Sequence, residues 1–200
     1  SGGWSPTVHL FSQARGTLRY DESLPALVPQ SSPLPIRAAG AANGRFGLAA
    51  ALADGRATGH VAASGDTAAS ALSAPQTQNG GTVPGKTLWS VPARNRADKR
   101  FVDLQTDVTV EDVELAAREG YTSVEHLKRY TTLGMATDQG KTSNVVGLAV
   151  MAELTGRSIQ ETGTTIFRPP HVPVAIGALA GHNRDETFHA TRLTPSHDWA

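Results

Sequence analysis

The feature that most constrains the fold of this chain is the stretch 66–88, which interrupts it near the middle. The stretch reads DTAASALSAPQTQNGGTVPGKTL, contains mainly small and polar residues, and shows no helical or strand periodicity. Such a segment buries too little apolar surface to offset the entropy of ordering it. We therefore expect a mobile linker here, and modest cores joined by long loops in the rest of the chain.

Composition excludes several classes of protein. Apolar residues make up 39% and aromatic residues 6% of the chain, and the formal net charge is zero. A neutral chain has no overall basic field to draw it to nucleic acid or anionic lipid. No apolar run approaches the length of a membrane span and no signal peptide is visible, so we expect a cytoplasmic protein. The start at Ser1 without an initiator Met indicates a piece of a longer chain.

The complete absence of cysteine limits the metal chemistry. The chain has 0 Cys and 7 His, and the histidines lack the spacing of a metal site. Disulfides, Cys-ligated zinc and an all-Cys iron–sulfur cluster are therefore excluded. We expect no metal site, and no catalytic set of Ser, His and Asp can be assigned from the sequence.

The first block, residues 1–65, is rich in Gly and Ala. Ile36-Arg-Ala-Ala-Gly40 predicts a short buried strand, and the spacing of apolar residues predicts a helix from Phe46 to Ala63. Gly55 and Gly59 inside that pattern each cost the helix roughly 1 kcal/mol relative to Ala. So many small residues indicate close packing against a sheet or another helix, and a tightly packed Ala helix is the plainer alternative.

The block after the linker, residues 98–156, carries the clearest helix signals. Thr109 followed by acidic residues predicts an N-cap, and Gly120 predicts the end of that first helix. Thr122-Ser-Val-Glu125 has the pattern of a capping box and predicts a second helix that ends near Thr131. A third helix is predicted to start at Thr142 or Ser143 and to stop at Gly156. Its inner face is expected to use Val146, Ala149, Val150 and Leu154.

The stretch Gln139-Gly-Lys-Thr-Ser143 is the most suggestive for ligand binding. Gly140 permits close backbone approach, Lys141 supplies a charge, and free N–H groups at a helix start favour a phosphate. A P-loop is excluded, because the position of its first glycine is occupied by Met135 and a helix precedes the turn. A capped turn with a solvated lysine is the alternative that spacing alone favours.

Longer strings resemble the alpha subunit of heterotetrameric sarcosine oxidase. The strings that carry the resemblance are SGGWSPTVHL at 1–10, AAGAANGRFG at 38–47, KRFVDLQTDVT at 99–109, VEHLKRYTTLGMATDQGKTSN at 124–144, TIFRPP at 165–170 and TPSHDW at 194–199. They extend over most of the chain and are far more specific than any short motif.

The resemblance implies an α+β fold with long loops. Residues 1–65 resemble the terminal strand and helix of a Rossmann-like NAD/FAD-type dinucleotide-binding domain, and residues 66–97 would form the linker. Residues 98–156 resemble the three-helix module of bacterioferritin-associated-ferredoxin-like domains. Residues 157–200 resemble the connector toward an aminomethyltransferase-like, folate-binding domain.

The helical module departs from its relatives at the cluster ligands. The four cysteines that hold a 2Fe–2S cluster in those domains correspond to Asp103, Gln105, Asp138 and Ser143 in this chain. None of these residues is a thiol, so we expect no iron–sulfur cluster. The scaffold is then left free for docking or for contact with a flavin.

The resemblance also implies cofactors and partners. The parent enzyme would oxidise sarcosine with O2 to glycine, H2O2 and methylene-tetrahydrofolate, and this piece alone would be inactive. FMN would lie at the interface with the beta subunit, whereas FAD and tetrahydrofolate would lie elsewhere in the complex. A non-catalytic helical interaction module of a related N-methyl amine or imino acid dehydrogenase or oxidase is the alternative. Expected contacts are Gly2, Gly3, Trp4, Val8 and Leu10 for NAD, and Thr131, Thr132, Lys141, Thr142 and Ser143 for FMN.

Overall fold

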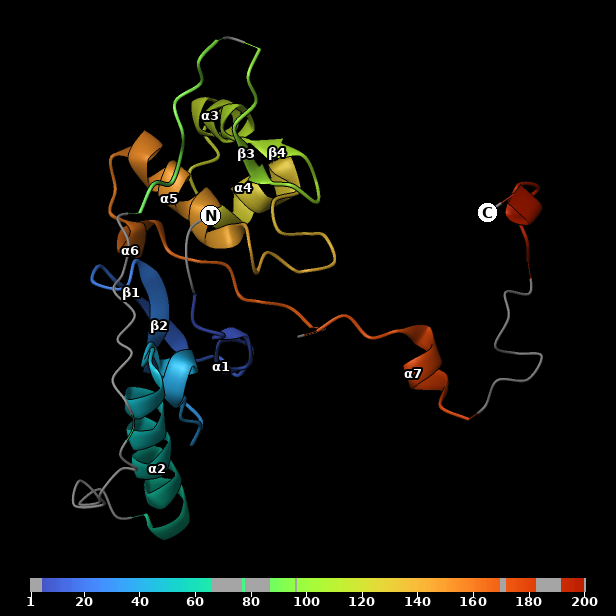
Figure 1. Ribbon diagram of the computed structural model, residues 1–200. Coiled ribbons are helices and arrows are strands. Elements are labelled where there is room, and N and C mark those ends of the chain that lie inside the picture. The colour runs from blue at the N-terminus through green and yellow to red at the C-terminus, as the bar shows by residue number, and fades with distance from the viewer. Residues whose placement is uncertain are drawn as a thin grey trace.

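A computed structural model of the chain describes residues 5–65, 77, 87–95, 97–169, 172–182 and 192–199. These residues form a mixed α and β structure, as expected from the sequence (Figure 1). Most of the predicted linker, residues 66–76 and 78–86, lies outside the described residues. None of the helices in the described ranges is long and apolar enough to span a membrane.

The elements fall into a first and a second group along the chain. The first group consists of α1 (His9–Gln13), β1 (Thr17–Asp21), β2 (Ala26–Ser31), the 3-10 helix η1 (Gly40–Asn43) and α2 (Leu48–Ser64). The second group consists of β3 (Phe101–Asp103), β4 (Val108–Thr109), α3 (Val110–Arg118), α4 (Val124–Thr131), α5 (Asn144–Thr155), α6 (Ile159–Thr162), α7 (Ile176–Ala180) and the 3-10 helix η4 (His197–Trp199).

Both small sheets are antiparallel hairpins. β1 pairs with β2 in a register that places Leu18 opposite Pro29 and Tyr20 opposite Leu27, with a bulge at Thr17/Leu18. β3 pairs with β4, and β4 leads directly into α3. Neither hairpin was predicted from the sequence, because the strands are short and β2 contains Pro29.

The helical module, formed by β3, β4, α3, α4 and α5, packs around its own core. Val113, Leu127 and Met151, one from each helix, are completely buried there. The remaining members of this core are Val102, Val108, Val110, Ala116, Leu133 and Val150. The three helices predicted from the sequence are therefore confirmed, and each contributes at least one side chain to one shared core.

The predicted helix ends are largely confirmed. Thr109 and Asp112 form a reciprocal capping box at the start of α3, which satisfies two otherwise free N–H groups. Gly120 and Gly156 follow α3 and α5 with positive φ angles of 91° and 67°. The start of α4 was predicted wrongly, because its N-cap is Ser123 instead of Thr122 and no side-chain cap bond forms there.

The inner face of α5 is wider than predicted. Leu148, Ala149, Met151 and Ala152 are all buried, so the helix is covered on most of its circumference. Leu154 was predicted to face the core, but its side chain is 43% exposed. The reason is that the helix is apolar nearly all round, and periodicity cannot identify the inner face of such a helix.

The first block contains one wrong and one confirmed prediction. Residues 36–40 do not form the expected buried strand: Ile36 is 40% exposed and its N–H donates to the carbonyl of Leu34. Pro33 and Pro35 remove two backbone donors directly before it, which disfavours strand pairing. The predicted helix is present as α2, but no side chain on it is buried by the described residues.

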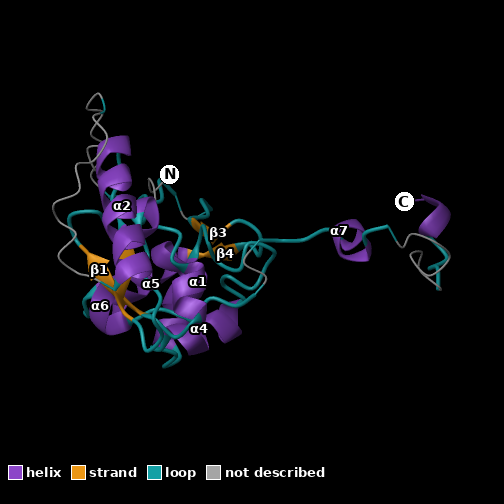
Figure 2. Cartoon of the chain, turned by 90° about the horizontal axis from the view of Figure 1, so that it is seen from below, coloured by secondary structure: helices purple, strands orange, loops and turns teal. Residues whose placement is uncertain are grey.

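A second core joins the first block to the helical module. It contains Val8, Phe11, Leu18 and Leu27 from α1 and the first hairpin, together with Val124, Leu148 and Phe167. Figures 1 and 2 show the first hairpin beside the module, with α2 extending away from it. The segment that carries α7 and η4 runs away from this packed body (Figure 1). Segments far apart in the sequence thus share one apolar interior.

We expect Leu127→Ala to destabilise the module strongly. Leu127 is fully buried between the three helices, so the truncation removes apolar burial and leaves a cavity. The expected loss is about 2–5 kcal/mol of unfolding free energy. Urea unfolding followed by circular dichroism measures it. Leu154→Ala on the exposed side is the matched control and should cost less than about 1 kcal/mol; equal losses in the two variants would contradict the assigned core.

Candidate functional site

A buried carboxylate, Asp103, joins three segments of the helical module. Its side chain is 2% exposed and lies at the end of β3. It accepts hydrogen bonds from the backbone N–H of Gln105 (2.9 Å), the backbone N–H of Gly134 (2.8 Å) and the hydroxyl of Ser143 (3.1 Å). A buried charge is tolerated only when such donors satisfy it. Asp103 therefore ties the α4–α5 turn and the start of α5 to β3.

The four positions that the resemblance aligned with cluster ligands, Asp103, Gln105, Asp138 and Ser143, lie together in one network. Ser143 donates to Asp103, and Gln105 donates to Asp103 through its backbone N–H. The side-chain carbonyl of Gln105 in turn accepts from the backbone N–H of Asp138 at 3.4 Å. A set of Asp, Gln, Asp and Ser side chains offers hydrogen bonds in place of thiolates. Among the described residues, no group of three or more His, Cys, Asp or Glu side chains is arranged to hold a metal ion.

The turn between α4 and α5 wraps around the side chain of Asn144. Gly134 and Gly140 have φ angles of 65° and 77°, and a Cβ atom at either position would collide with that amide. The amide nitrogen of Asn144 donates to the hydroxyl of Thr165 at 3.3 Å. Both glycines are therefore required by positive φ and by close approach. This geometry explains the two glycines of the turn.

Asp138 organises the turn directly before α5. Its carboxylate accepts from the backbone N–H of Gly140 (2.9 Å) and from the hydroxyl (2.6 Å) and backbone N–H (3.1 Å) of Thr142. Partial burial raises the pKa of Asp138, but these hydrogen bonds and the charge of Lys141 outweigh it and hold the pKa below its usual range. The turn is therefore most strongly held when Asp138 is ionised.

The residues expected to contact FMN are neighbours, but they differ in accessibility. The Ser143 side chain is 1% exposed and bonded to Asp103, whereas Thr132 and Thr142 are exposed. The hydroxyl of Thr131 donates to the carbonyl of Leu127 at 2.8 Å. Lys141 is half-buried and forms no ion pair with a described side chain. Lys141 is thus the cation of this turn that is open to a ligand.

A cleft of about 260 Å³ brings Lys141 close to the N-terminal segment. Its walls include Val8 from the NAD set, together with Thr7, Gly140 and Phe167. Leu10 lies on α1 and is 61% exposed, away from this cleft. Gly2, Gly3 and Trp4 lie outside the described residues. The structure thus places one residue of each expected cofactor set in the same cleft.

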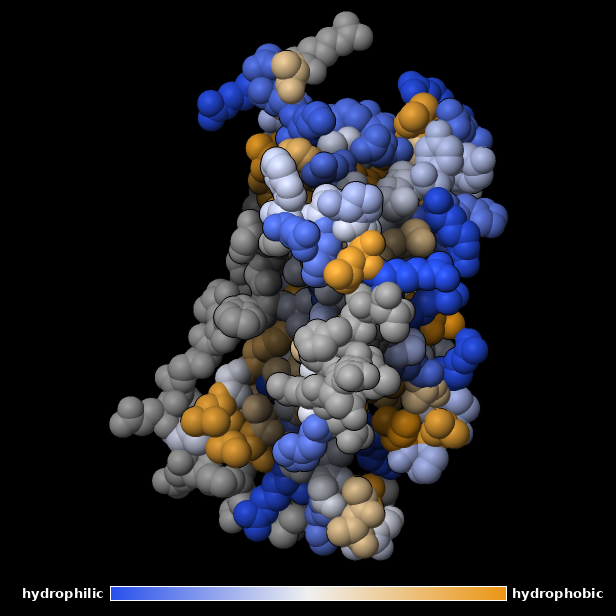
Figure 3. Space-filling model, turned by 90° about the vertical axis from the view of Figure 1, so that its right-hand side faces the viewer, coloured by the Kyte–Doolittle hydropathy of each residue, from blue (hydrophilic) through white to orange (hydrophobic). Residues whose placement is uncertain are grey.

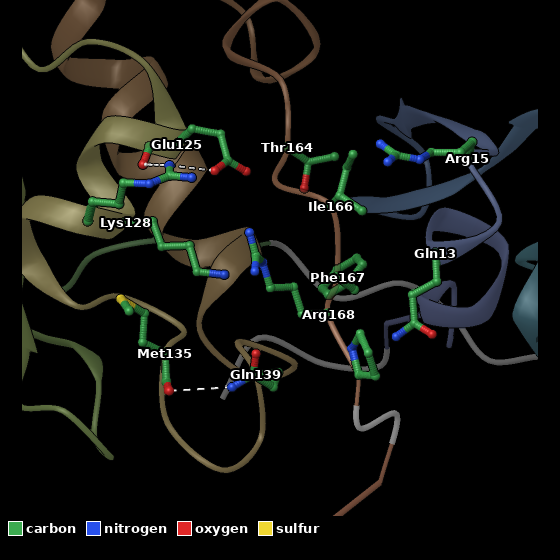
Figure 4. Close-up of a pocket in the computed structure, with 12 residues that line it drawn as sticks. Gln13, Arg15, Glu125, Lys128, Met135, Gln139, Thr164, Ile166, Phe167 and Arg168 are labelled. Carbon is green, nitrogen blue, oxygen red and sulfur yellow. Dashed lines mark hydrogen bonds and ion pairs between the residues drawn. The ribbon is translucent and has the colours of Figure 1, made fainter.

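A larger groove lies between α4, the end of α1 and the segment 164–169 (Figure 4). It was not predicted from the sequence. It has a volume of about 890 Å³. We call it the basic groove, and it is lined by Gln13, Arg15, Glu125, Lys128, Arg129, Met135, Gln139, Thr164, Ile166, Phe167, Arg168 and Pro169. The only sequence signal was the Lys128-Arg129 pair, because the other cations come from distant segments.

Comparison with known proteins identifies close relatives in sequence. Residues 97–182 match the family described as the sarcosine oxidase A3 domain. The whole chain is 44% identical to the sarcosine oxidase subunit alpha of Corynebacterium sp. (strain P-1), and 41% identical to that of Rhizobium meliloti (strain 1021). The chain spans 21% and 20% of the length of these two relatives.

Comparison of the fold identifies a solved relative. The structure is similar to that of L-proline dehydrogenase from P. horikoshii, with a TM-score of 0.60 and 22% sequence identity. The likeness covers 89% of this chain and 38% of the other. It therefore extends over both the first block and the helical module, and it concerns the fold.

We expect Thr142→Val to raise the pKa of Asp138. The substitution removes the hydroxyl donor that stabilises the ionised carboxylate and keeps the side-chain shape. In the parent chain the pKa of folded Asp138 is depressed, so ionised Asp138 stabilises the folded state. This stabilisation is fully present above the unfolded pKa of about 3.9 and is lost as the pH falls through the folded pKa. Carboxyl titration by NMR measures the shift. Thr131→Val, whose hydroxyl bonds to a helix carbonyl, is the control and should leave Asp138 unchanged.

Proposed function

We propose that this chain, which corresponds along its whole length to a segment of the sarcosine oxidase alpha subunit, lines a flavin and docks other subunits in an oxidase complex. The observation that carries the proposal is the 44% identity over 100% of the chain, because the match extends over every part of it. The complex would oxidatively demethylate sarcosine with O2. The chain spans only 21% of its relatives, and it would be inactive alone.

The turn at 131–143 is the proposed contact with FMN at the interface with a beta subunit. Three features of this turn support the proposal. Lys141 is a half-buried cation without a described ion-pair partner, Thr142 is an exposed residue whose hydroxyl and N–H are held by Asp138, and Thr132 is also exposed. FMN, when bound, would supply the transfer of electrons to oxygen. Lys141 would place a positive charge beside the negative charge of the reduced flavin ring or of the phosphate.

NAD is proposed at the N-terminal segment in the longer subunit. Val8 and Thr7 form one wall of the 260 Å³ cleft, which is smaller than the pockets of about 300–1,000 Å³ that enclose whole small ligands. The cleft would therefore hold one end of a dinucleotide at most. The remaining contacts would come from the first βαβ unit of the dinucleotide-binding fold, which the relatives' additional length can supply.

An iron–sulfur cluster does not fit the helical module. The four corresponding positions hold Asp103, Gln105, Asp138 and Ser143, and all four of their side chains already accept or donate hydrogen bonds inside the fold. We propose that this module derives from a cluster-binding ancestor similar to bacterioferritin-associated-ferredoxin-like domains. It would then retain the scaffold for docking and for shaping the flavin environment.

The remaining parts of the chain have proposed roles in the longer subunit. Residues 1–65 would complete a Rossmann-like dinucleotide-binding domain, which explains why α2 is not buried by the described residues. Residues 157–200 would connect the module to a folate-binding domain. The exposed side chains of Val172, Val174, Ile176 and Leu179 would be covered in that assembly.

A second proposal is a non-catalytic interaction module in a complex that acts on another N-methyl amine or an imino acid. It is favoured by the exposed apolar side chains of the C-terminal segment, which suit docking and need no cofactor. The spectrum and mass of the complex that the intact subunit captures separate the two proposals. FMN absorbance together with sarcosine oxidation supports the first proposal, and a complex without FMN supports the second.

We expect Lys141→Met in the intact complex to lower FMN content or to slow reoxidation by oxygen. The substitution removes a cation beside the proposed flavin while it keeps the length of the side chain. Reduction by the amine, which would occur at a separate FAD, should change much less. Stopped-flow measurement of the two half-reactions, with flavin extraction, checks the prediction.

Lys99→Met is the matched control, because Lys99 is exposed and does not line this cleft. It should behave like the parent in both half-reactions. Unchanged FMN content together with unchanged reoxidation in Lys141→Met would contradict the proposed contact.

A further inference from the structure

The basic groove carries an excess of positive charge. Arg15, Lys128, Arg129 and Arg168 line it, and Glu125 is its one carboxylate among the described lining residues. Glu125 is paired with Arg129 through an ion pair of 2.7 Å on the same helix. Three cations from three separate segments, Arg15, Lys128 and Arg168, therefore remain without an ion pair to a described side chain.

Two of these cations converge. Figure 4 shows the side chains of Lys128, from α4, and Arg168, from the segment after α6, pointing toward one another across the groove. Burial lowers the pKa of Lys128; Glu125 opposes the effect, while Arg168 and Arg129 add to it. Like charges in this arrangement repel, and an anion between them would replace the repulsion with two favourable contacts.

The opposite wall supplies a neutral donor. The side-chain nitrogen of Gln13 is buried and has no hydrogen-bond partner among the described residues. Figure 4 shows this amide directed into the groove, on the side opposite Lys128. A buried donor without a partner is costly, and an acceptor on a ligand bound in the groove would satisfy it.

An apolar wall completes the groove. Met135 and Ile166 line the groove and are partly exposed, and the ring of Phe167, which also lines it, is buried. An inorganic anion would need only the cations, whereas an organic phosphate ester would also bury apolar surface against this wall. On the face drawn in Figure 3, apolar side chains lie in small separate patches between hydrophilic ones.

We propose that the basic groove binds the phosphate group of a nucleotide-type ligand between Lys128 and Arg168, with Gln13 as an additional donor and Met135 and Ile166 against the organic part. A phosphate suits these residues because it accepts several hydrogen bonds at once and pairs well with a guanidinium. The inference rests on the proposed function, since it assigns the phosphate subsite of the flavin or of NAD to residues outside the 131–143 turn and the N-terminal segment.

The groove and the Lys141 cleft are neighbouring but separate. Both are lined by Phe167, whereas Lys128 and Arg168 line only the groove and Lys141 lines only the cleft. A ligand that spans Phe167 could therefore place its ring near one cation and its phosphate near the others. The two assignments can be tested independently because they use different side chains.

The test uses the full-length alpha subunit and four probes: FMN, riboflavin, NAD and inorganic phosphate. Calorimetric titrations compare the parent with Lys128→Gln, Arg168→Gln and Arg168→Lys, and circular dichroism verifies that each variant is folded. Arg56→Gln is the matched control, because Arg56 is an exposed cation on α2 that does not line the groove. We expect each Gln variant to weaken the binding of a phosphate-bearing probe by about tenfold or more. Arg168→Lys should recover part of the affinity, and riboflavin should be unaffected.

The outcomes identify the source of the phosphate. Weakened FMN binding assigns the groove to the flavin, weakened NAD binding assigns it to the dinucleotide, and weakened binding of inorganic phosphate alone assigns it to a free anion. Unchanged binding of all phosphate-bearing probes in both Gln variants would overturn the inference. If Lys141→Met leaves FMN binding unaffected while the groove variants weaken it, the phosphate site in the basic groove is supported and the proposed role of Lys141 is contradicted.

Discussion

The hydrogen bonds to the Asp103 carboxylate are the interaction on which the helical module depends. They join the end of β3, the turn at Gly134 and the start of α5 at a point where water is excluded. Each of these donors would cost about 1–3 kcal/mol if it were left buried and unpaired. The apolar core determines that the three helices pack, but it is non-directional. The carboxylate adds the directional constraint that positions the turn against β3.

Further hydrogen bonds extend this constraint. Ser143 and the backbone N–H of Gln105 donate to Asp103, and the backbone N–H of Asp138 donates to the side chain of Gln105. Asn144 fills the space inside the turn and makes glycine necessary at 134 and 140. The network that results is polar and carries two carboxylates.

Local signals in the sequence predicted much of this fold, and non-local contacts account for what was missed. The capping box of Thr109 and Asp112 and the glycines that end the helices involve residues within one helical turn, so they can be recognised from the sequence alone. Ser143 sits at the N-cap position of α5, but its hydroxyl bonds to Asp103, forty residues away, which no spacing rule reveals. The second core and the basic groove combine α1, α4 and the segment at 164–169, and only the tertiary structure brings them together.

The second core has a consequence for where the chain can be divided. The composition marks residues 66–97 as the natural boundary, yet Leu18 and Leu27 before it pack with Val124, Leu148 and Phe167 after it. A cut in that region would leave two pieces, each with an apolar face that water must solvate, and such faces promote aggregation. The smallest autonomous unit therefore begins before Val8 and ends after Phe167. A gene fusion or truncation that follows the composition would separate two halves of one interior.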